Sequence, residues 1–257
     1  MSLVSTPAVV LRTYRWSETS KIVRLATRDL GVQSAVAKGA LRPRSAFGAG
    51  LELLSDGIAH LYHRETRDLQ TLGGFELVDL RRGLARDVAR FAGATALAEM
   101  MLKMAPAAPL PAAFDAFVAG LDALGRVDAA TVDAAGLRAA WLLLGALGFE
   151  PLLGRCARDG ALIDAANGAS IRFSVADGGV LCAACAATDN GAANLPAAAY
   201  RDLVTLNTAG AALPLLDAPH AAAHRRLVLR FVRHHLGEQG GLPALEFWMR
   251  RAWVADS

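Results

Sequence analysis

The first 80 residues of the chain alternate between short apolar runs and turn signals. The runs are rich in β-branched and aromatic residues, and even and odd positions differ in character over residues 58–62, as in a half-buried strand. Turn signals separate the runs at Asp29-Leu30-Gly31, Gly39, Pro43 and Asp56-Gly57. The pattern predicts five short strands, within TPAVVLRTYR, SKIVRLAT, VQSAVAKG, LELLSDGIAHLYH and LQTLGGFELV.

Five short strands without a long helix between them favour a small barrel. A five-stranded oligonucleotide-binding (OB) barrel is one architecture of this size, and an SH3-like barrel is the nearest alternative.

After Asp79 the pattern becomes helical. Apolar residues spaced three or four apart predict an amphipathic helix that ends before a group of prolines, its stripe formed by Leu84, Val88, Phe91, Thr95 and Ala98. Asp128 or Thr131 could cap a later helix. The further helices are predicted over residues 111–125, 133–147, 196–206, 219–236 and 243 to about 254.

Helical periodicity stops between Gly148 and about Asn190. This stretch is rich in glycine and contains a strand-like IRFSV followed by an Asp-Gly-Gly turn, which predicts a short hairpin with cysteines at its two ends. We therefore expect an α+β protein, with an N-terminal five-stranded OB-like β-barrel and a mainly α-helical domain that carries a small hairpin insert. The expected domains are residues 1–80 and 81–257, the second interrupted by the cysteine-containing module at residues 150–188.

The chain of 257 residues is 54% hydrophobic, which suffices for a sizeable core. Its longest near-continuous apolar stretch, residues 139–149, is too short to cross a bilayer and predicts a buried helix. The N-terminus lacks the basic region and apolar run of a secretory signal. We expect a cytoplasmic protein with no membrane contact.

Charge is distributed unevenly along the chain. The whole chain carries +3, but the segment between Arg12 and Arg44 has eight basic residues against Glu18 and Asp29, a net charge of +6. Such asymmetry is typical of a face that binds a polyanion, and a solvated basic surface without a ligand is the alternative. The basic residues are Arg12, Arg15, Lys21, Arg24, Arg28, Lys38, Arg42 and Arg44.

The three cysteines raise the question of a metal site. Cys182 and Cys185 form a C-x-x-C pair, while Cys156 is followed by Asp159 where a second pair would have its partner cysteine. A structural zinc needs four ligands, so Asp159 would be the fourth. The alternatives are a metal-free module held together by Leu162, Ile171, Phe173 and Val180, and a redox pair, for which the thioredoxin-like context is missing.

Two features of the segment 219–236 allow a functional interpretation. His220 and His224 share one helix face, but neither the glutamate of an H-E-x-x-H motif nor a third ligand accompanies them, so we expect solvated histidines. A basic stripe also runs along the helix beside an apolar one. It could form a core helix with a solvated face, a second phosphate-contacting surface, or a cleft for an acidic peptide.

Enzyme signatures are largely absent from the sequence. It contains no Walker A loop, G-x-S-x-G, H-E-x-x-H or G-x-G-x-x-G motif, and its carboxylates form no evident pair. We expect the protein not to be an enzyme.

Several stretches resemble the RecO family of bacterial recombination-mediator proteins. The stretches are AVVLRTYRWSETSKIVRLATRDLGVQSAVAKGALRPRS, the cysteine-bearing LGFEPLLGRC and FSVADGGVLCAAC, and LRFVRHHLGEQGGLPALEFW. They lie in the family's order along nearly the whole chain. The departure is Asp159, since zinc-bearing members show two C-x-x-C pairs.

The resemblance implies an OB barrel followed by a helical domain with a zinc-finger-like insert. It implies a DNA repair and homologous recombination mediator of the RecF pathway, which binds single- and double-stranded DNA, anneals complementary strands and helps load RecA onto coated single strands. The implied partners are RecR and the C-terminal tail of single-stranded DNA-binding protein, and the implied location is cytoplasmic and nucleoid-associated. A protein-only adaptor that binds partner peptides is the alternative function.

These considerations select the candidate site residues. Basic residues would neutralise phosphates, and exposed aromatic residues would stack on bases. Among the aromatic residues Tyr14 is expected in the barrel core, and Trp16 and Phe47 could be either core or stacking platforms. The predicted DNA-binding residues are Arg12, Arg15, Lys21, Arg24, Lys38, Arg42, Arg44 and Trp16.

The predicted partner-tail site is Arg226, Leu227, Arg230, Phe231 and Arg233. The predicted ligands of a single structural zinc are Cys156, Asp159, Cys182 and Cys185.

Overall fold

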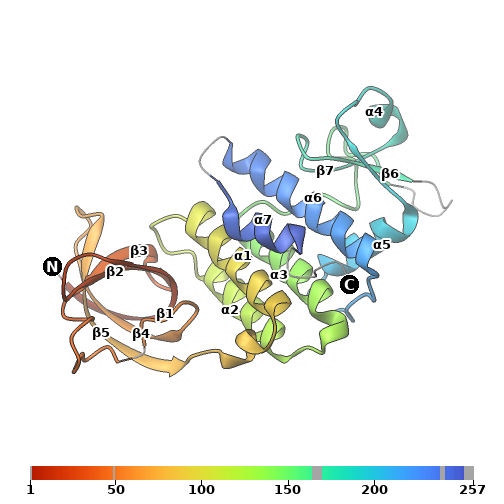
Figure 1. Cartoon of the computed structure of the whole chain (residues 1–257). Coiled ribbons are helices and arrows are strands. Elements are labelled where there is room, and N and C mark those ends of the chain that lie inside the picture. The colour runs from red at the N-terminus through yellow and green to blue at the C-terminus, as the bar shows by residue number, and fades with distance from the viewer. Residues whose placement is uncertain (1, 49, 164–169, 238–240, 252–257) are drawn as a thin grey trace. The chain divides into compact units, whose positions relative to one another are not determined.

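A computed structural model describes residues 2–48, 50–163, 170–237 and 241–251 of the chain (Figure 1). The chain divides into two compact units, Met1–Arg126 and Val127–Ser257. The first unit contains the barrel together with the two helices that follow it. The expected division into domains at residue 80 therefore stays a prediction.

The N-terminal strands form a closed barrel in the order β1-β2-β3-β5-β4, and β4 pairs back onto β1 (Figure 1). The β3–β5 pair is parallel, and the other four pairs are antiparallel. The predicted five-stranded OB-like barrel is confirmed. The strands are β1 (Ser2–Arg15), β2 (Lys21–Thr27), β3 (Gly31–Ala37), β4 (Asp56–His63) and β5 (Leu69–Asp79).

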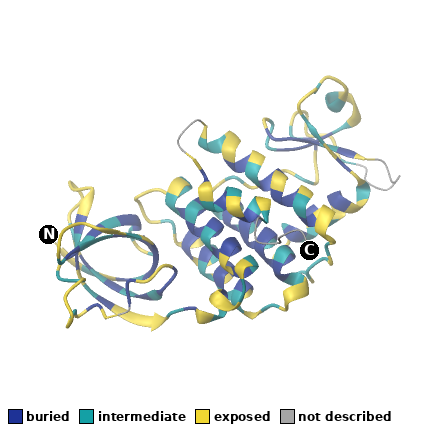
Figure 2. Ribbon diagram, viewed as in Figure 1, coloured by how far each residue is buried: buried dark blue, intermediate teal, exposed yellow. Residues whose placement is uncertain are grey.

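Alternate residues of these strands fill the barrel with apolar side chains, which Figure 2 shows as buried positions along its inside. Val10, Leu25 and Leu61 are fully buried there. The predicted turn at Asp56-Gly57 is wrong, because both residues belong to β4. A side chain at Gly57 would lie 2.3 Å from the carbonyl oxygen of Glu76, so this glycine permits close strand pairing and does not mark a turn.

Two helices follow the barrel in the first unit, α1 (Val88–Met104) and α2 (Pro111–Arg126), after a short 3₁₀ turn, η1 (Arg82–Arg86). The predicted apolar stripe of α1 is partly wrong, since Val88 and Phe91 are 46% and 41% exposed. Small residues such as Ala92 and Ala96 are buried instead. The buried face of α1 also includes the large residues Leu97, Met100 and Met101, so the helix is oriented by its second half and not by Val88 and Phe91.

Arg81 ties the barrel to the helices of this unit. Its side chain is 5% exposed and donates to the carboxylates of Asp56 on β4, at 2.9 Å, and of Asp122 on α2. Burial raises the pKa of Asp56, and the nearby Arg81 opposes that rise. Breaking such a buried pair by removing one partner typically costs about 3–5 kcal/mol, so this arginine is a main link between the strands and α2.

The second unit contains four longer helices, two of which contribute rings to an aromatic cluster. Trp141 of α3, Phe173 of β6 and Phe231 of α6 have ring centroids 5.3–6.4 Å apart. The predicted helices and the hairpin of β6 and β7 are confirmed, except that the last helix ends at Arg250 and not near residue 254. Arg251 has left-handed backbone, with φ 44°, which ends the helix there. The elements are η2 (Ala129–Thr131), α3 (Val132–Ala146), β6 (Ile171–Ser174), β7 (Gly179–Leu181), α4 (Ala183–Ala187), β8 (Ala193–Leu195), α5 (Ala197–Leu206), α6 (Ala218–Leu236) and α7 (Pro243–Arg250).

One segment, Ala129–Ala146, is long and apolar enough in composition to cross a membrane. This is weak evidence for a span, because 56% of the segment is buried and its Trp141 lies in the aromatic cluster of the second unit. A core helix has the same properties. The expected absence of membrane contact stays a prediction.

The expectation that both histidines of α6 are solvated is wrong for His224. The side chain is buried, and neither ring nitrogen has a hydrogen-bond partner among the described residues. Its position on the same helix face as Ala221 and Val228 turns it toward the interior. Burial lowers the pKa of His224, with Asp202 acting in the opposite direction and His220 adding to the decrease.

Replacement of His224 by leucine is expected to stabilise the protein. An unsatisfied buried polar group costs about 1–3 kcal/mol, so His224→Leu should raise the free energy of unfolding by roughly 1 kcal/mol at pH 8. The unfolded chain binds a proton near pH 6.5 while the folded chain resists it. The gain should therefore grow as the pH falls below about 6.5. Urea unfolding at pH 8 and pH 5.5 measures it, with His234→Leu at an exposed position of α6 as the control. An equal effect of both substitutions would contradict the prediction.

Candidate functional site

Four of the predicted basic residues lie opposite one another on the first two strands. Arg12 pairs with Arg24 in the β1–β2 register, and Arg15 pairs with Lys21 three residues further on. Like charges directly opposite each other on an antiparallel pair repel. Both pairs lie in the half of this hairpin next to its turn, and since residues three apart on a strand point to opposite faces, one pair lies on each face.

The other three basic residues lie in the turns after β3. Lys38 directly follows Ala37, which pairs with Lys21. Arg42 and Arg44 follow, and the backbone N–H of Leu41 donates to the carbonyl of Thr19 at 3.0 Å. This bond joins the loop after β3 to the β1–β2 turn. The structure thus brings the loop residues to the same end of the barrel as Arg15 and Lys21.

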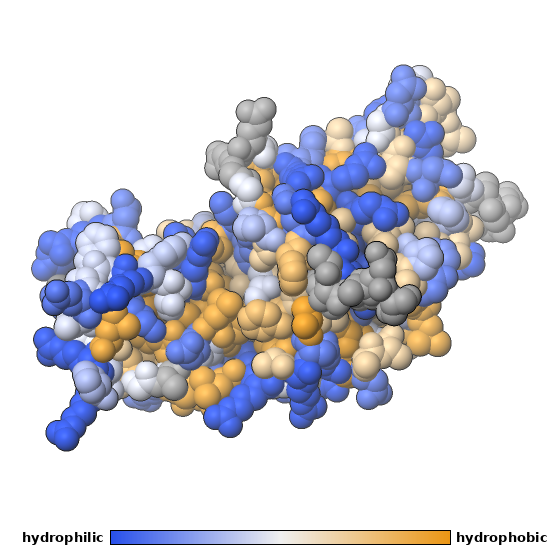
Figure 3. Space-filling view, in the orientation of Figure 1, coloured by the Kyte–Doolittle hydropathy of each residue, from blue (hydrophilic) through white to orange (hydrophobic). Residues whose placement is uncertain are grey.

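None of these seven basic side chains takes part in an ion pair among the residues that the structure describes. Arg28, from the same segment, differs because it forms two hydrogen bonds of 2.9 and 3.0 Å with Asp115. On the face that Figure 3 presents, hydrophilic side chains lie along the outer part of the barrel, with hydrophobic ones beside them. The seven cations are thus not engaged in direct ion pairs within the described protein, which leaves them available to a polyanion.

Two aromatic residues accompany the basic group. Trp16 is 60% exposed in the β1–β2 turn, and Tyr14 is 44% exposed. The expectation that Tyr14 lies in the core is wrong, because it shares the outer face of β1 with Arg12, whose guanidinium carbon lies 5.1 Å from the ring centroid. Phe47 is 7% exposed in the barrel core and cannot stack on a base.

Another loop near the predicted site was missed. In OB barrels the face of strands 2 and 3 and the loops 1–2 and 4–5 bind oligonucleotides. The β4–β5 loop here contains the exposed Arg64 and Arg67. Its sequence RETRD carries two basic and two acidic residues, so net charge did not point to this loop as a binding site. Its position between the fourth and fifth predicted strands could have pointed to it.

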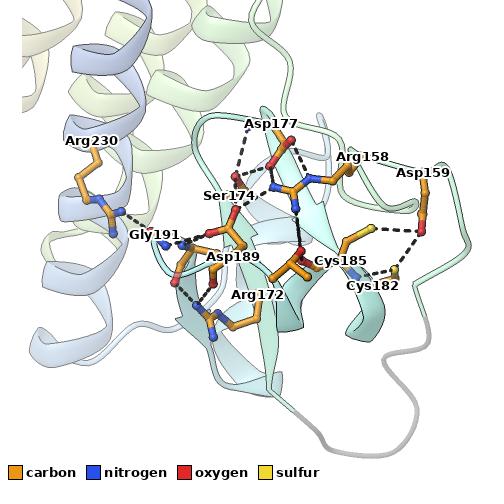
Figure 4. Close-up of polar contacts among 12 residues, drawn as sticks. Arg158, Asp159, Arg172, Ser174, Asp177, Cys182, Cys185, Asp189, Gly191 and Arg230 are labelled. Atoms are coloured by element: carbon orange, nitrogen blue, oxygen red, sulfur yellow. Dashed lines mark hydrogen bonds and ion pairs between the residues drawn. The ribbon is translucent and has the colours of Figure 1, made fainter.

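The four predicted metal ligands lie together in the second unit. One ligand atom from each of Cys156, Asp159, Cys182 and Cys185 lies within 4.8 Å of all the others. A carboxylate oxygen of Asp159 accepts from the thiols of Cys182 and Cys185, each at 3.2 Å (Figure 4). Ligands bound tetrahedrally at 2.3 Å lie about 3.7 Å apart, so these four residues fit a group that can hold a metal ion.

The chemistry of this group favours a cation. The backbone N–H of Ala161 and the three thiols hold the pKa of Asp159 well below its usual range. Burial raises the pKa of Cys156, but the backbone N–H groups of Cys182, Asp159 and Arg158 more than offset it and lower that pKa overall. The hydrogen bond to Asp159 raises the pKa of Cys185 to about 12. A metal ion that bound thiolates here would therefore displace protons.

A polar network centred on Arg158 provides a second link within the module. Its guanidinium reaches Asp177 at 2.7 Å and Asp189 at 2.9 Å, and it also donates to the carbonyl of Cys185 (Figure 4). Ser174 donates to Asp177 at 2.6 Å. The network joins the Cys156 turn to the β6–β7 hairpin and to the segment after α4. No sequence motif had indicated it.

The apolar residues predicted to hold a metal-free module divide into two groups. Ile171, Phe173 and Val180 are buried, whereas Leu162 is 73% exposed and does not pack inside. Leu162 forms an isolated β-bridge with Arg155 through its backbone, which leaves its side chain outside. Phe173 joins the hairpin to the aromatic cluster of the helices.

The predicted partner-tail residues on α6 do not form one surface. Leu227 and Phe231 are buried, at 4% and 1% exposure, because their spacing of four places both toward the core. Arg226, Arg230 and Arg233 are exposed. Arg230 donates to the carbonyl of Gly191, and Arg233 pairs with a neighbour on α7, so the apolar half of this prediction is wrong.

Loss of the Arg158 side chain is expected to loosen the module. Arg158→Met removes the link between the Cys156 turn and Asp177 and Asp189, so amide hydrogen exchange of β6 and β7 should become faster. Hydrogen exchange followed by mass spectrometry measures it. Arg201→Met, at an exposed position of α5, is the control and should leave the hairpin unchanged. Unaltered exchange in Arg158→Met would show that the network does not support the hairpin.

Comparison with known proteins places this arrangement in a family. The model of "Recombination protein O N terminal" matches residues 1–81, and that of "Recombination protein O C terminal" matches residues 85–243. A DNA repair protein RecO of Anaeromyxobacter dehalogenans is 34% identical over 244 residues, 93% of this chain and 94% of that protein.

Relatives from other bacteria are similar to the chain to the same degree. A DNA repair protein RecO of Symbiobacterium thermophilum is 35% identical over 80% of both chains, and one of Rubrobacter xylanophilus is 32% identical over 92% of both. The matches cover the barrel, the helices and the cysteine module. The chain belongs to the RecO family.

Proposed function

We propose that this protein acts in DNA repair and homologous recombination as a mediator that binds single- and double-stranded DNA through its barrel. The observation that carries the proposal is the group of seven basic side chains without carboxylate partners, beside the exposed Trp16 and Tyr14. Membership in a family whose relatives are named DNA repair proteins supports it.

The proposed binding is independent of base sequence. Arginine and lysine side chains neutralise phosphates and release counterions, while Trp16 and Tyr14 offer faces on which any base can stack. Two complementary strands repel each other through their phosphates. Neutralising that charge on one strand would allow the second to approach, which is what annealing requires. We extend the proposal to annealing and to helping RecA load onto coated single strands.

We also propose that the protein is not an enzyme. Its proposed partners are RecR and the C-terminal tail of single-stranded DNA-binding protein. The tail site needs revision, because Leu227 and Phe231 are buried. A cavity of about 650 Å³ between α6 and α7 offers Leu229 and Met249 beside Arg226. Apolar and cationic groups together suit an acidic peptide with apolar side chains.

DNA binding is expected to depend steeply on salt. Neutralising about five phosphates gives a slope near −3.5 in a plot of log affinity against log salt for single strands. Arg42→Glu with Arg44→Glu should weaken binding at least tenfold and make the slope shallower by about 1.4. Fluorescence anisotropy of a labelled single strand measures both quantities.

The matched control is Arg82→Glu with Arg86→Glu, which makes the same charge change at two exposed positions of η1. It should bind nearly as the unaltered protein does, apart from long-range charge effects. No binding at low salt would contradict the proposal and favour a protein-only adaptor. Equal losses in both double variants would mean that net charge alone, and no particular face, attracts DNA.

We further propose that the cysteine module holds one structural zinc ion through Cys156, Asp159, Cys182 and Cys185. Three thiolates and one carboxylate satisfy tetrahedral coordination, and aspartate is a harder ligand than thiolate. The ion would join the Cys156 turn to the start of α4. Its role would be to stabilise the fold of the module, since its four ligands leave no open position for a substrate.

Zinc binding is expected to depend on Asp159. Loss of a residue that hydrogen-bonds to a metal ligand typically lowers metal affinity about 10–100-fold, so loss of a ligand itself in Asp159→Ala should lower zinc affinity at least as much. Asp159→Cys should bind zinc more tightly than the unaltered protein. Zinc content after dialysis and the absorbance of the cobalt-substituted protein measure the difference. Equal metal content in all three proteins would exclude Asp159 as a ligand, and no metal in any of them would contradict the site.

A further inference from the structure

A cavity of about 530 Å³ lies beside the barrel within the first unit. Its volume falls in the range of about 300–1,000 Å³ that small-molecule sites have. It lies where β2 and β3 meet the β4–β5 loop, and the segment between α1 and α2 forms its remaining wall. The lining residues used below are Arg24, Leu30, Val32, Glu65, Arg67, Asp68, Ala107 and Pro109.

Hydrogen bonds fix the walls of this cavity. The side chain of Gln70 accepts from the N–H of Arg64 at 2.9 Å and donates to its carbonyl at 3.1 Å, which fastens the β4–β5 loop. The N–H of Val32 donates to the carbonyl of Pro106 at 3.0 Å. Gly31 allows this approach, since a side chain there would lie 2.2 Å from the Ala108 carbonyl oxygen. The cavity is therefore formed before any ligand arrives.

Arg24 brings to one wall of the cavity a positive charge that forms no ion pair within the described part of the chain. Its Nε is buried without a hydrogen-bond partner, and Arg12 lies directly across the sheet from it. Glu65 and Asp68 line the same cavity, but neither forms an ion pair with Arg24 among the described residues. The buried Nε of Arg24, a donor without an acceptor, suits an anionic group of a ligand.

The rest of the lining suits a nucleobase. Leu30, Val32 and Pro109 supply apolar contacts for a ring, while carboxylates accept hydrogen bonds from exocyclic amino groups of bases, which Glu65 and Asp68 could do. We propose that this cavity takes one unstacked nucleotide of a single strand, with its phosphate on Arg24 and its base toward Glu65 and Asp68. The inference rests on the proposed DNA binding and adds to it a subsite that a paired base cannot enter.

Filling the cavity without changing its charge tests the subsite. Ala107 is exposed at its rim, so Ala107→Trp should leave the barrel core intact, and Ala119→Trp at an exposed position of α2 is the matched control. Ala107→Trp should bind a deoxycytidine 12-mer, whose bases carry exocyclic amino groups, about tenfold more weakly. Its salt slope and its affinity for duplex should not change. Arg24→Gln should weaken binding to both and make the single-strand slope shallower by about 0.7.

Crosslinking of the unaltered protein gives an independent measurement. A 12-mer of 5-iododeoxycytidine, which is photoreactive and keeps the exocyclic amino group, should crosslink to peptides that contain residues 63–68 or 107–109, and Ala107→Trp should abolish these crosslinks. Crosslinks confined to other peptides would overturn the subsite. So would an Ala107→Trp protein that binds single strands normally or loses single-strand and duplex binding equally. Absence of any DNA binding would instead reject the proposed function, and the subsite with it.

Discussion

The pairing of β1 with β2 places like charges opposite each other, and the proposed DNA binding depends on this placement of basic residues. The register sets Arg12 against Arg24 and Arg15 against Lys21, and no ion pair among the described residues relieves the repulsion. A one-residue shift would relieve it but would move the buried Val23 and Leu25 to the outer face. Burial of the core therefore maintains a concentration of charge that electrostatics alone would disperse.

The cysteine module depends on several independent links. The group around Asp159 joins the Cys156 turn to α4, the Arg158 network joins the same turn to the hairpin, and Phe173 joins the hairpin to the helices. Arg158 and Asp159 are neighbours in sequence, so one short turn contributes to two of these links. Because polar and apolar contacts hold the module together, an aspartate can stand where a second C-x-x-C pair would have a cysteine.

The sequence predicted the fold where local pattern and tertiary packing agree. All five strands and the main helices were identified, because alternation and helical spacing directly reflect which side is buried. The errors occur where packing depends on distant residues. Phe91 is exposed while the alanines beside it are buried, and His224 is buried although it is polar.

The sequence identified most residues of the candidate site but not how they are arranged in space. The basic segment and the four possible metal ligands were identified from charge and spacing, whereas Tyr14 was assigned to the wrong face of β1. Strand register decides which residues lie opposite each other on neighbouring strands. It cannot be derived from the charge of the segment or from the spacing of its residues. The cavity beside Arg24 depends on the β4–β5 loop and on residues 107–109, which are far apart in the sequence and become neighbours only in the folded unit.

The central claim is that single-stranded DNA lies against the basic end of the barrel. Hydrogen exchange of the full chain, followed by mass spectrometry with and without a single strand, tests it most directly. We expect slower exchange in peptides that cover residues 12–24 and 38–44, with no change in α5. Protection confined to residues 127–257, with none in the barrel, would contradict the account.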